Sequence, residues 1–241
     1  MQKSIEIQEK SGIFTRSYWK AAAGQLKDVR MLTIAALIVA LRIAVKFFKI
    51  PLAAGLSISL DAYVNSLGSV IYGPVTGLLV GAVSDLLGCI VTGQMAEYFP
   101  PFMLVEMMSS FIFGLFFWRR KISIKKVLIS KFTVNFVCNI IMTSLFNKWY
   151  YYLYFGVEKA QAYNIINGMR IAKNLILFPL EGAIIVAVLS AALPILARLK
   201  LVDKRNCFVQ KPSYPDLIFR IASLTLIAVE LIIIYLIFTM K

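Results

Sequence analysis

Long apolar segments, separated by short polar stretches, recur along almost the whole chain. Crossing the hydrocarbon core of a bilayer takes about 20 apolar residues in a helix, and several segments approach this length. Because a helix in lipid satisfies its own backbone hydrogen bonds, the pattern predicts an all-α integral membrane protein. The segments lie at about 31–48, 57–72, 74–92, 102–118, 126–147, 168–197 and 216–238.

Helix-breaking residues mark the boundaries between these segments. Gly73 and Pro74 separate the second segment from the third, and the link 92–101 contains two prolines that exclude a continuous helix. The aromatic-rich stretch 147–163 fits a membrane–water interface. The pattern divides the chain into a polar segment, a helical core, a linker and an additional transmembrane helix, at 1–30, 31–198, 199–215 and 216–238.

The composition agrees with a membrane protein, and the charge sets its orientation. Hydrophobic residues make up 60% of the 241, and the mean hydropathy is +0.79; soluble domains are about 45–50% apolar. Of the Lys and Arg residues behind the net charge of +14, sixteen fall on the side of the N-terminus and five on the opposite side. We therefore expect a multi-pass membrane protein with a cytoplasmic N-terminus. The basic excess then serves orientation and contact with the lipid bilayer, with no nucleic-acid partner.

The sequence lacks the residues and motifs that several classes of function require. The chain has no histidine, which removes His-based metal sites and the usual general base. It also lacks the phosphate loop of ATPases and the G-x-S-x-G motif of hydrolases. Its three cysteines form no C-x-x-C pair. We expect no catalytic residue, metal site or cofactor, and a membrane enzyme is a disfavoured alternative.

Six ionisable residues fall in the outer half of the predicted bundle. In one interpretation these charges neutralise one another and hold the helices together. In the other they line a polar pocket open to the outside, which their common depth favours. Lys131 lies near the inner end of its segment, and its side chain is expected to reach the cytoplasmic surface. The six residues are Arg42, Asp61, Asp85, Glu106, Arg170 and Lys173.

The segment 168–197 carries polar residues on one helix face. Arg170, Lys173, Asn174 and Glu181 follow a spacing of three or four residues, together with Leu177. Two cations in an apolar wall attract an anion, and arginine can hold a carboxylate by two parallel hydrogen bonds. The alternative is that both cations only extend to the outer headgroups.

Two further features are candidates for contact with a flat ligand. Asn139 shares a helix face with Asn135, and their amides are suited either to the edge of a heterocycle or to hydrogen bonds between helices. Tyr98 and Phe99, in the link 92–101, are placed either to stack on aromatic rings or to join the interface belt. Elsewhere, a row of small residues on the segment 31–48 permits close approach of another helix, at Ala36, Ala40 and Ala44.

Together these features resemble the substrate-binding S components of energy-coupling factor (ECF) vitamin transporters, and within that group the folate family. The resemblance covers roughly residues 31–198. It is carried by the alanine row, by "YGPVTGLLVGAVSDLLG" with the proline-rich link after it, and by "RIAKNLILFPLEG". The last is the most specific, because a basic pair before an apolar run and a Pro-x-Glu recurs in that family.

The resemblance implies a six-helix bundle that binds one vitamin near the extracellular face. Such a subunit docks on a transmembrane coupling protein driven by two ATPase subunits, here through Ala36, Ala40 and Ala44. With folate as the vitamin, the implied anion contacts are Arg42, Arg170 and Lys173. Near the ligand rings we expect Tyr98, Phe99 or Asn139, and Asp85 is a further candidate substrate-binding residue.

Three points stay open at this stage. The same scaffold serves other vitamins or heterocycles, such as riboflavin or a queuosine precursor. An ion-coupled secondary transporter is a further alternative, although no convincing internal repeat is present. The segment 216–238 departs from a six-helix pattern, and it lies either at the periphery or beside the alanine row.

Overall fold

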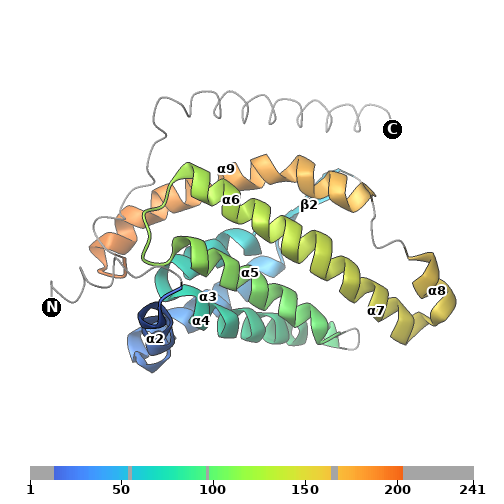
Figure 1. The fold of residues 1–241 in the computed structure, drawn as a ribbon, viewed down its shortest axis with the longest axis horizontal. Helices are drawn as coiled ribbons and strands as arrows, with labels where there is room; N and C mark the ends of the chain where they lie inside the picture. Colours follow the sequence, from blue (N-terminus) through green and yellow to red (C-terminus); the bar gives the residue numbers. More distant parts are fainter. Residues whose placement is uncertain (1–13, 54–55, 96–97, 164–167, 203–241) are drawn as a thin grey trace.

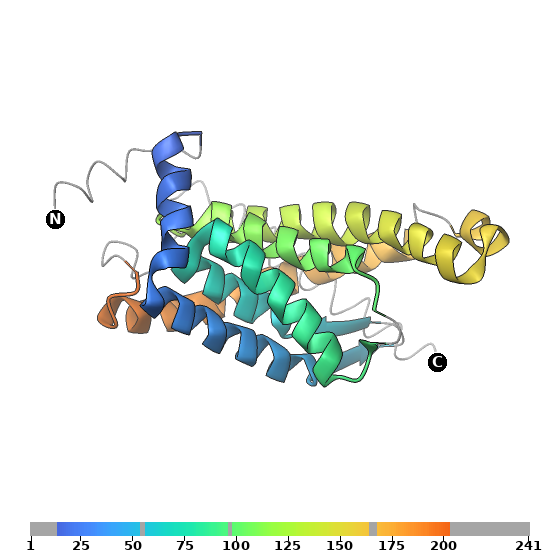
Figure 2. The same cartoon turned by 90° about the horizontal axis from the view of Figure 1, so that it is seen from below.

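The computed structural model describes residues 14–53, 56–95, 98–163 and 168–202, and long helices dominate it (Figures 1 and 2). The all-helical membrane fold is confirmed, apart from one short hairpin. The predicted helix 216–238, and the linker from residue 203 onward, lie outside the described residues. In order, the elements are α2 (Arg16–Gly24), η1 (Gln25–Lys27), α3 (Val29–Lys46), β1 (Lys49–Ala53), β2 (Leu56–Ser59), α4 (Asp61–Val91), α5 (Pro101–Phe117), α6 (Ile124–Val134), η3 (Asn135–Met142), α7 (Thr143–Phe155), α8 (Val157–Ala162) and α9 (Gly168–Arg198).

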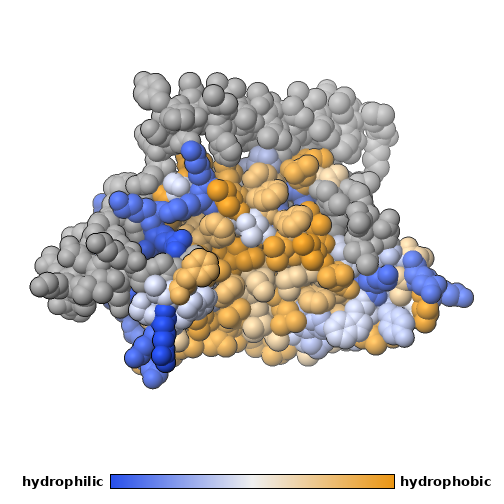
Figure 3. All heavy atoms as spheres, viewed as in Figure 1, coloured by the Kyte–Doolittle hydropathy of each residue, from blue (hydrophilic) through white to orange (hydrophobic). Residues whose placement is uncertain are grey.

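The surface of the molecule has the polarity that a bilayer requires. Within the described residues, three helices are long and apolar enough to cross a membrane, at Asp61–Val91, Ile124–Phe155 and Ala172–Arg198. Figure 3 shows a broad hydrophobic area on one face, with hydrophilic residues gathered toward the two ends of the long axis. The prediction of a multi-pass membrane protein is confirmed.

The segment before α4 differs from the sequence-based expectation. Residues 57–59 were expected to open a helix, whereas the structure pairs β1 and β2 as an antiparallel hairpin with Lys49 opposite Ser59. The stretch Ser57-Ile58-Ser59 alternates polar and apolar residues, which is the period of a strand. The first turn of α4 therefore begins at Asp61.

α4 changes direction at Gly73, as the Gly-Pro pair predicted. Gly73 has φ 79° and ψ −174°, which is open to glycine but strained for other residues. The indole ring of Trp118 packs directly against it, and a Cβ at this position would lie 2.7 Å from Trp118 Cδ2. Counting the two halves of α4 separately, the described residues supply the six predicted core spans, with α6, η3 and α7 forming one of them.

Two helical features were not predicted. The polar N-terminal segment contains α2, which lies across one end of the bundle (Figure 2). Its Tyr18 packs edge-on against Trp118, with ring centroids 5.2 Å apart. The span expected at 126–147 is interrupted by the π-helix η3 and continues to Phe155. The bundle core lies between α4, α5, α6 and α9, around Phe113, Val127 and Ile185.

Replacing Gly73 by Ala should destabilise the protein more than replacing Gly93. Both glycines have positive φ, so alanine costs each about 1–3 kcal/mol in backbone strain. Only Gly73 also faces a packed ring, since nothing lies within 4 Å of a Cβ built at Gly93. Thermal unfolding of the purified variants in detergent should show the larger drop in Tm for Gly73→Ala. Equal drops would contradict the role of the Trp118 contact.

Candidate functional site

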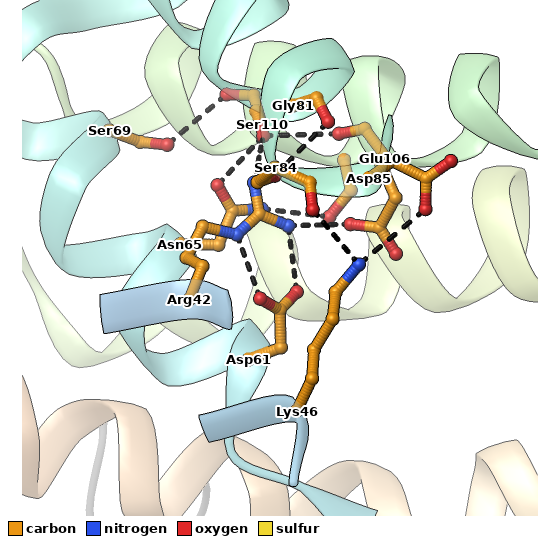
Figure 4. Close-up of polar contacts among 11 residues, drawn as sticks. Arg42, Lys46, Asp61, Asn65, Ser69, Gly81, Ser84, Asp85, Glu106 and Ser110 are labelled. Carbon is orange, nitrogen blue, oxygen red and sulfur yellow. Dashed lines mark hydrogen bonds and ion pairs between the residues drawn. The ribbon is translucent and has the colours of Figure 1, made fainter. Parts of the chain in front are cut away.

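A buried arginine near the end of α3 joins three helices. Arg42 on α3 is 0% exposed, and its Nε and Nη2 donate to the two carboxylate oxygens of Asp61 at 2.8 and 2.7 Å. Nη2 also donates to Glu106 Oε2 on α5 at 2.6 Å (Figure 4). Such paired, charge-assisted bonds fix both distance and orientation. The interaction therefore holds α3, the start of α4 and α5 in one arrangement.

Hydroxyl and amide groups extend this network between α4 and α5. Ser110 Oγ accepts from Arg42 Nη1 at 3.3 Å and donates to Asn65 Oδ1 at 2.8 Å. Ser69 Oγ donates to the Ser110 carbonyl at 3.2 Å. These buried polar groups satisfy one another, as a low-dielectric interior requires.

A second ion pair lies beside the first network (Figure 4). Lys46 Nζ is 3.5 Å from Asp85 Oδ1 and donates to the Ser84 carbonyl at 3.3 Å. The other oxygen of Asp85, Oδ2, is buried and has no hydrogen-bond partner among the described residues. Tyr98, in the link between α4 and α5, is near enough that partial burial and the Asp85 charge raise the pKa of its hydroxyl.

The structure thus gathers four of the six ionisable residues predicted to share one depth. Arg42, Asp61 and Glu106 pair directly, and Asp85 pairs with Lys46. These contacts match the interpretation in which charges neutralise one another and hold helices together. Direct contact of Arg42 or Asp85 with a ligand stays a prediction.

Three asparagines form an amide cluster between η3 and α9. Asn139 Nδ2 donates to Asn174 Oδ1 at 3.0 Å and to Asn135 Oδ1 at 3.1 Å. Asn135 Nδ2 donates to the Asn174 carbonyl at 3.2 Å. The cluster lies where the helix adopts π geometry, which in proteins is frequent at functional sites. Asn139 and Asn174 remain partly exposed.

The start of α9 holds the predicted basic pair. Lys173 lies directly beside Asn174 in the chain and is partly buried. Arg170 belongs to the first turn of α9, but its side chain lies outside those described. Lys173 therefore brings a positive charge next to the amide cluster.

Lys131 does not reach the cytoplasmic surface, so that prediction was wrong. Its Nζ lies 2.9 Å from Glu181 Oε2 on α9, and the two side chains are only 4% and 15% exposed. Pairing with the carboxylate of Glu181 compensates the ammonium charge inside the bundle. Gly182 permits the close approach of the helices, because a Cβ there would lie 2.6 Å from Leu128 Cδ2 on α6.

Phe99 is part of an aromatic cluster rather than an open platform. It is buried, and its ring meets four others at centroid distances between 5.5 and 6.3 Å. The cluster holds the α4–α5 link against α7, and a stacking role for Phe99 on a ligand stays a prediction. Part of the stretch 147–163, expected from the sequence to lie at a membrane–water interface, belongs to this cluster. The four partners are Phe102, Trp149, Tyr150 and Tyr154.

The alanine row lies on the outside of α3. Ala36, Ala40 and Ala44 are all exposed, whereas Ile38 and Arg42 on the opposite side are buried. Small residues at this spacing leave the backbone of α3 accessible to another helix. The residues 203–241 lie outside the described part, so their position relative to this face is not described.

Comparison with known proteins agrees with this architecture. A curated relative, the folate transporter FolT of Clostridium novyi (strain NT), is 28% identical over 120 residues. The match spans 50% of this chain and 64% of that protein, which is just under two thirds of its length. A crystal structure of FolT bound with folic acid superposes with a TM-score of 0.53 at 25% identity, covering 65% of this chain and 89% of the other.

The family assignment itself extends over most of the chain. Residues 30–201 match the family described as ECF transporter, substrate-specific component. This range contains the Arg42 network, the amide cluster, the Lys131–Glu181 pair and the alanine row. The chain therefore belongs to the substrate-specific components of ECF transporters.

Proposed function

We propose that this chain is the folate-binding subunit of an ECF-type importer in the bacterial plasma membrane. The observation that carries the proposal is the likeness to a FolT structure bound with folic acid, over 65% of this chain. Folate combines a flat pterin, an aminobenzoate ring and a glutamate with two carboxylates. A site for it needs cations at one end and hydrogen-bonding groups near the rings.

The start of α9 and its neighbours match those requirements best. Lys173, with Arg170 one turn before it, provides positive charge for the glutamate carboxylates. Asn139 and Asn174 present both donors and acceptors beside it. The ring contacts of Phe99 hold the α4–α5 link against α7, and Tyr98 and Phe99 of this link remain our candidates for contact with the ligand rings. Riboflavin is the second candidate ligand. It also has a flat ring system, and the family resemblance implies that the same scaffold serves other vitamins.

Arg42 and Asp85 serve this site indirectly in our proposal. The guanidinium of Arg42 forms ion pairs with Asp61 and Glu106, and Asp85 is paired with Lys46. Both residues then stabilise the wall made by α3, α4 and α5, and direct contact of either one with the ligand stays a prediction. The chain performs no chemistry of its own, and a transmembrane coupling protein with two ATPase subunits supplies the energy from the cytoplasmic side, where the N-terminus lies.

Removing the charge of Lys173 should weaken folate binding. One charge-assisted hydrogen bond contributes about 1.5–3 kcal/mol, so Lys173→Ala should raise the Kd roughly 10- to 100-fold. Equilibrium binding of folate to the purified protein in detergent measures this effect. Lys20→Ala, at an exposed position on α2, is the matched control and should bind as the unaltered chain does. Saturable binding of riboflavin, with none of folate, would contradict the proposed ligand.

A larger residue in the alanine row should block coupling without affecting the ligand. Ala40 is exposed on α3, so Ala40→Leu leaves the packed interior unchanged but thickens the docking face. We expect unchanged folate binding, together with loss of copurification with the coupling protein and loss of folate uptake in cells. Ala191→Leu, at an exposed alanine of α9, is the control and should retain both activities. Full uptake by Ala40→Leu would show that the partner docks elsewhere.

A further inference from the structure

The Lys131–Glu181 ion pair lies inside the apolar core and is not among the residues of the binding site proposed above. It joins α6 to α9 at 2.9 Å, and both side chains are largely buried. A third polar group lies in the same core, because Tyr63 on α4 belongs to one cluster with Val127 of α6 and Ile185 of α9, within electrostatic range of Glu181. Tyr63 is 4% exposed, and its hydroxyl has no hydrogen-bond partner in the described part of the chain.

Stability alone does not account for this arrangement. Desolvating two charges offsets most of their mutual attraction, and well-packed apolar residues commonly do as well or better in their place. A buried hydroxyl without a partner is a further cost. An ion pair, a free hydroxyl and a partly accessible carboxylate in one place are suited to receive polar groups of a ligand.

The position of Glu181 on α9 relates it to the proposed mouth of the site. Lys173, Asn174, Leu177 and Glu181 share one face of the helix. Seven residues separate Asn174 from Glu181, which corresponds to about 10 Å along the axis. Along this face the side chains therefore change from cation to amide to carboxylate, going from the start of α9 toward its middle.

We propose that Glu181 is a specificity-determining residue that binds the hydrogen-bond-donor edge of a pterin ring. This inference rests on the proposed function. A pterin carries an exocyclic 2-amino group beside the N3–H, two parallel donors that match the two oxygens of a carboxylate, as a guanidinium does. The opposite, anionic end of the ligand then lies at Lys173. Lys131 acts as a positioning residue that holds Glu181 through Oε2, and the Tyr63 hydroxyl bonds a ring heteroatom.

The same geometry discriminates between the two candidate ligands. A flavin presents acceptor, donor and acceptor along the corresponding edge, so one of its carbonyl oxygens would face a carboxylate oxygen. A site built for two adjacent donors rejects such a ligand strongly, because buried polar groups are left unpaired. The carboxylate of Glu181 thereby favours a pterin over a flavin.

The test compares folate with a folate analogue that lacks the 2-amino group, using the purified full chain in detergent. Glu181→Gln replaces one acceptor oxygen by a donor, and we expect it to weaken folate binding roughly 10- to 100-fold. The analogue cannot make the bidentate contact, so Glu181→Gln should change its affinity by less than about threefold. Tyr63→Phe removes a hydroxyl without a protein partner; we expect Tm to hold and folate affinity to fall roughly fivefold.

A double variant separates ligand contact from folding. Lys131→Met with Glu181→Leu removes both charges and leaves no unpaired one, so the protein should fold with a similar Tm and still lose folate affinity. Unchanged folate affinity in the folded double variant, or equal losses for folate and the analogue in Glu181→Gln, would overturn the inference. An unaltered chain that binds riboflavin but not folate would instead overturn the proposed function and this inference with it.

Discussion

The arrangement of the first half of the chain depends on one buried guanidinium. Arg42 has no exposed surface, and it is bonded to Asp61, Glu106 and Ser110. Because an unpaired charge in the interior of a membrane bundle is costly, these partners are required wherever Arg42 is buried. They come from the first turn of α4 and from α5, so satisfying one side chain places three helices. The outer face of α3, with its alanines, is oriented by the same constraint.

Charged side chains form two separate groups in the described part of the bundle. Arg42, Lys46 and three carboxylates occupy the α3–α4–α5 side, and Lys131 with Glu181 joins α6 to α9. Cys138 on η3 is fully buried in the core cluster that also contains Phe113 of α5 and Ile185 of α9. Each group of charges therefore joins its own set of helices within the apolar bundle.

Three irregular backbone segments help to position these groups. The sequence predicts one of them and not the other two. Gly73 followed by Pro74 marks the kink in α4 directly, because positive φ and a missing N–H leave few alternatives. The π-helix η3 carries no such residue, so the sequence does not predict its geometry. Only the structure shows it, with Asn135 and Asn139 hydrogen-bonded to Asn174. The hairpin 49–59 was missed because its apolar residues merge with those of the following helix.

The sequence alone determined that the protein is a helical membrane bundle, where most spans begin and end, and which residues of α3 and α9 share a face. These properties follow from hydropathy and from the helical repeat, which are local. The tertiary structure decided which charges pair. In the folded bundle Arg42 pairs with Asp61 and Glu106, and Lys131 pairs with Glu181. Phe99 is enclosed by four aromatic rings, one of them that of Trp149. A helical repeat states which side a residue faces, but the partner on that side depends on the rotation and packing of neighbouring helices, which only the folded bundle fixes.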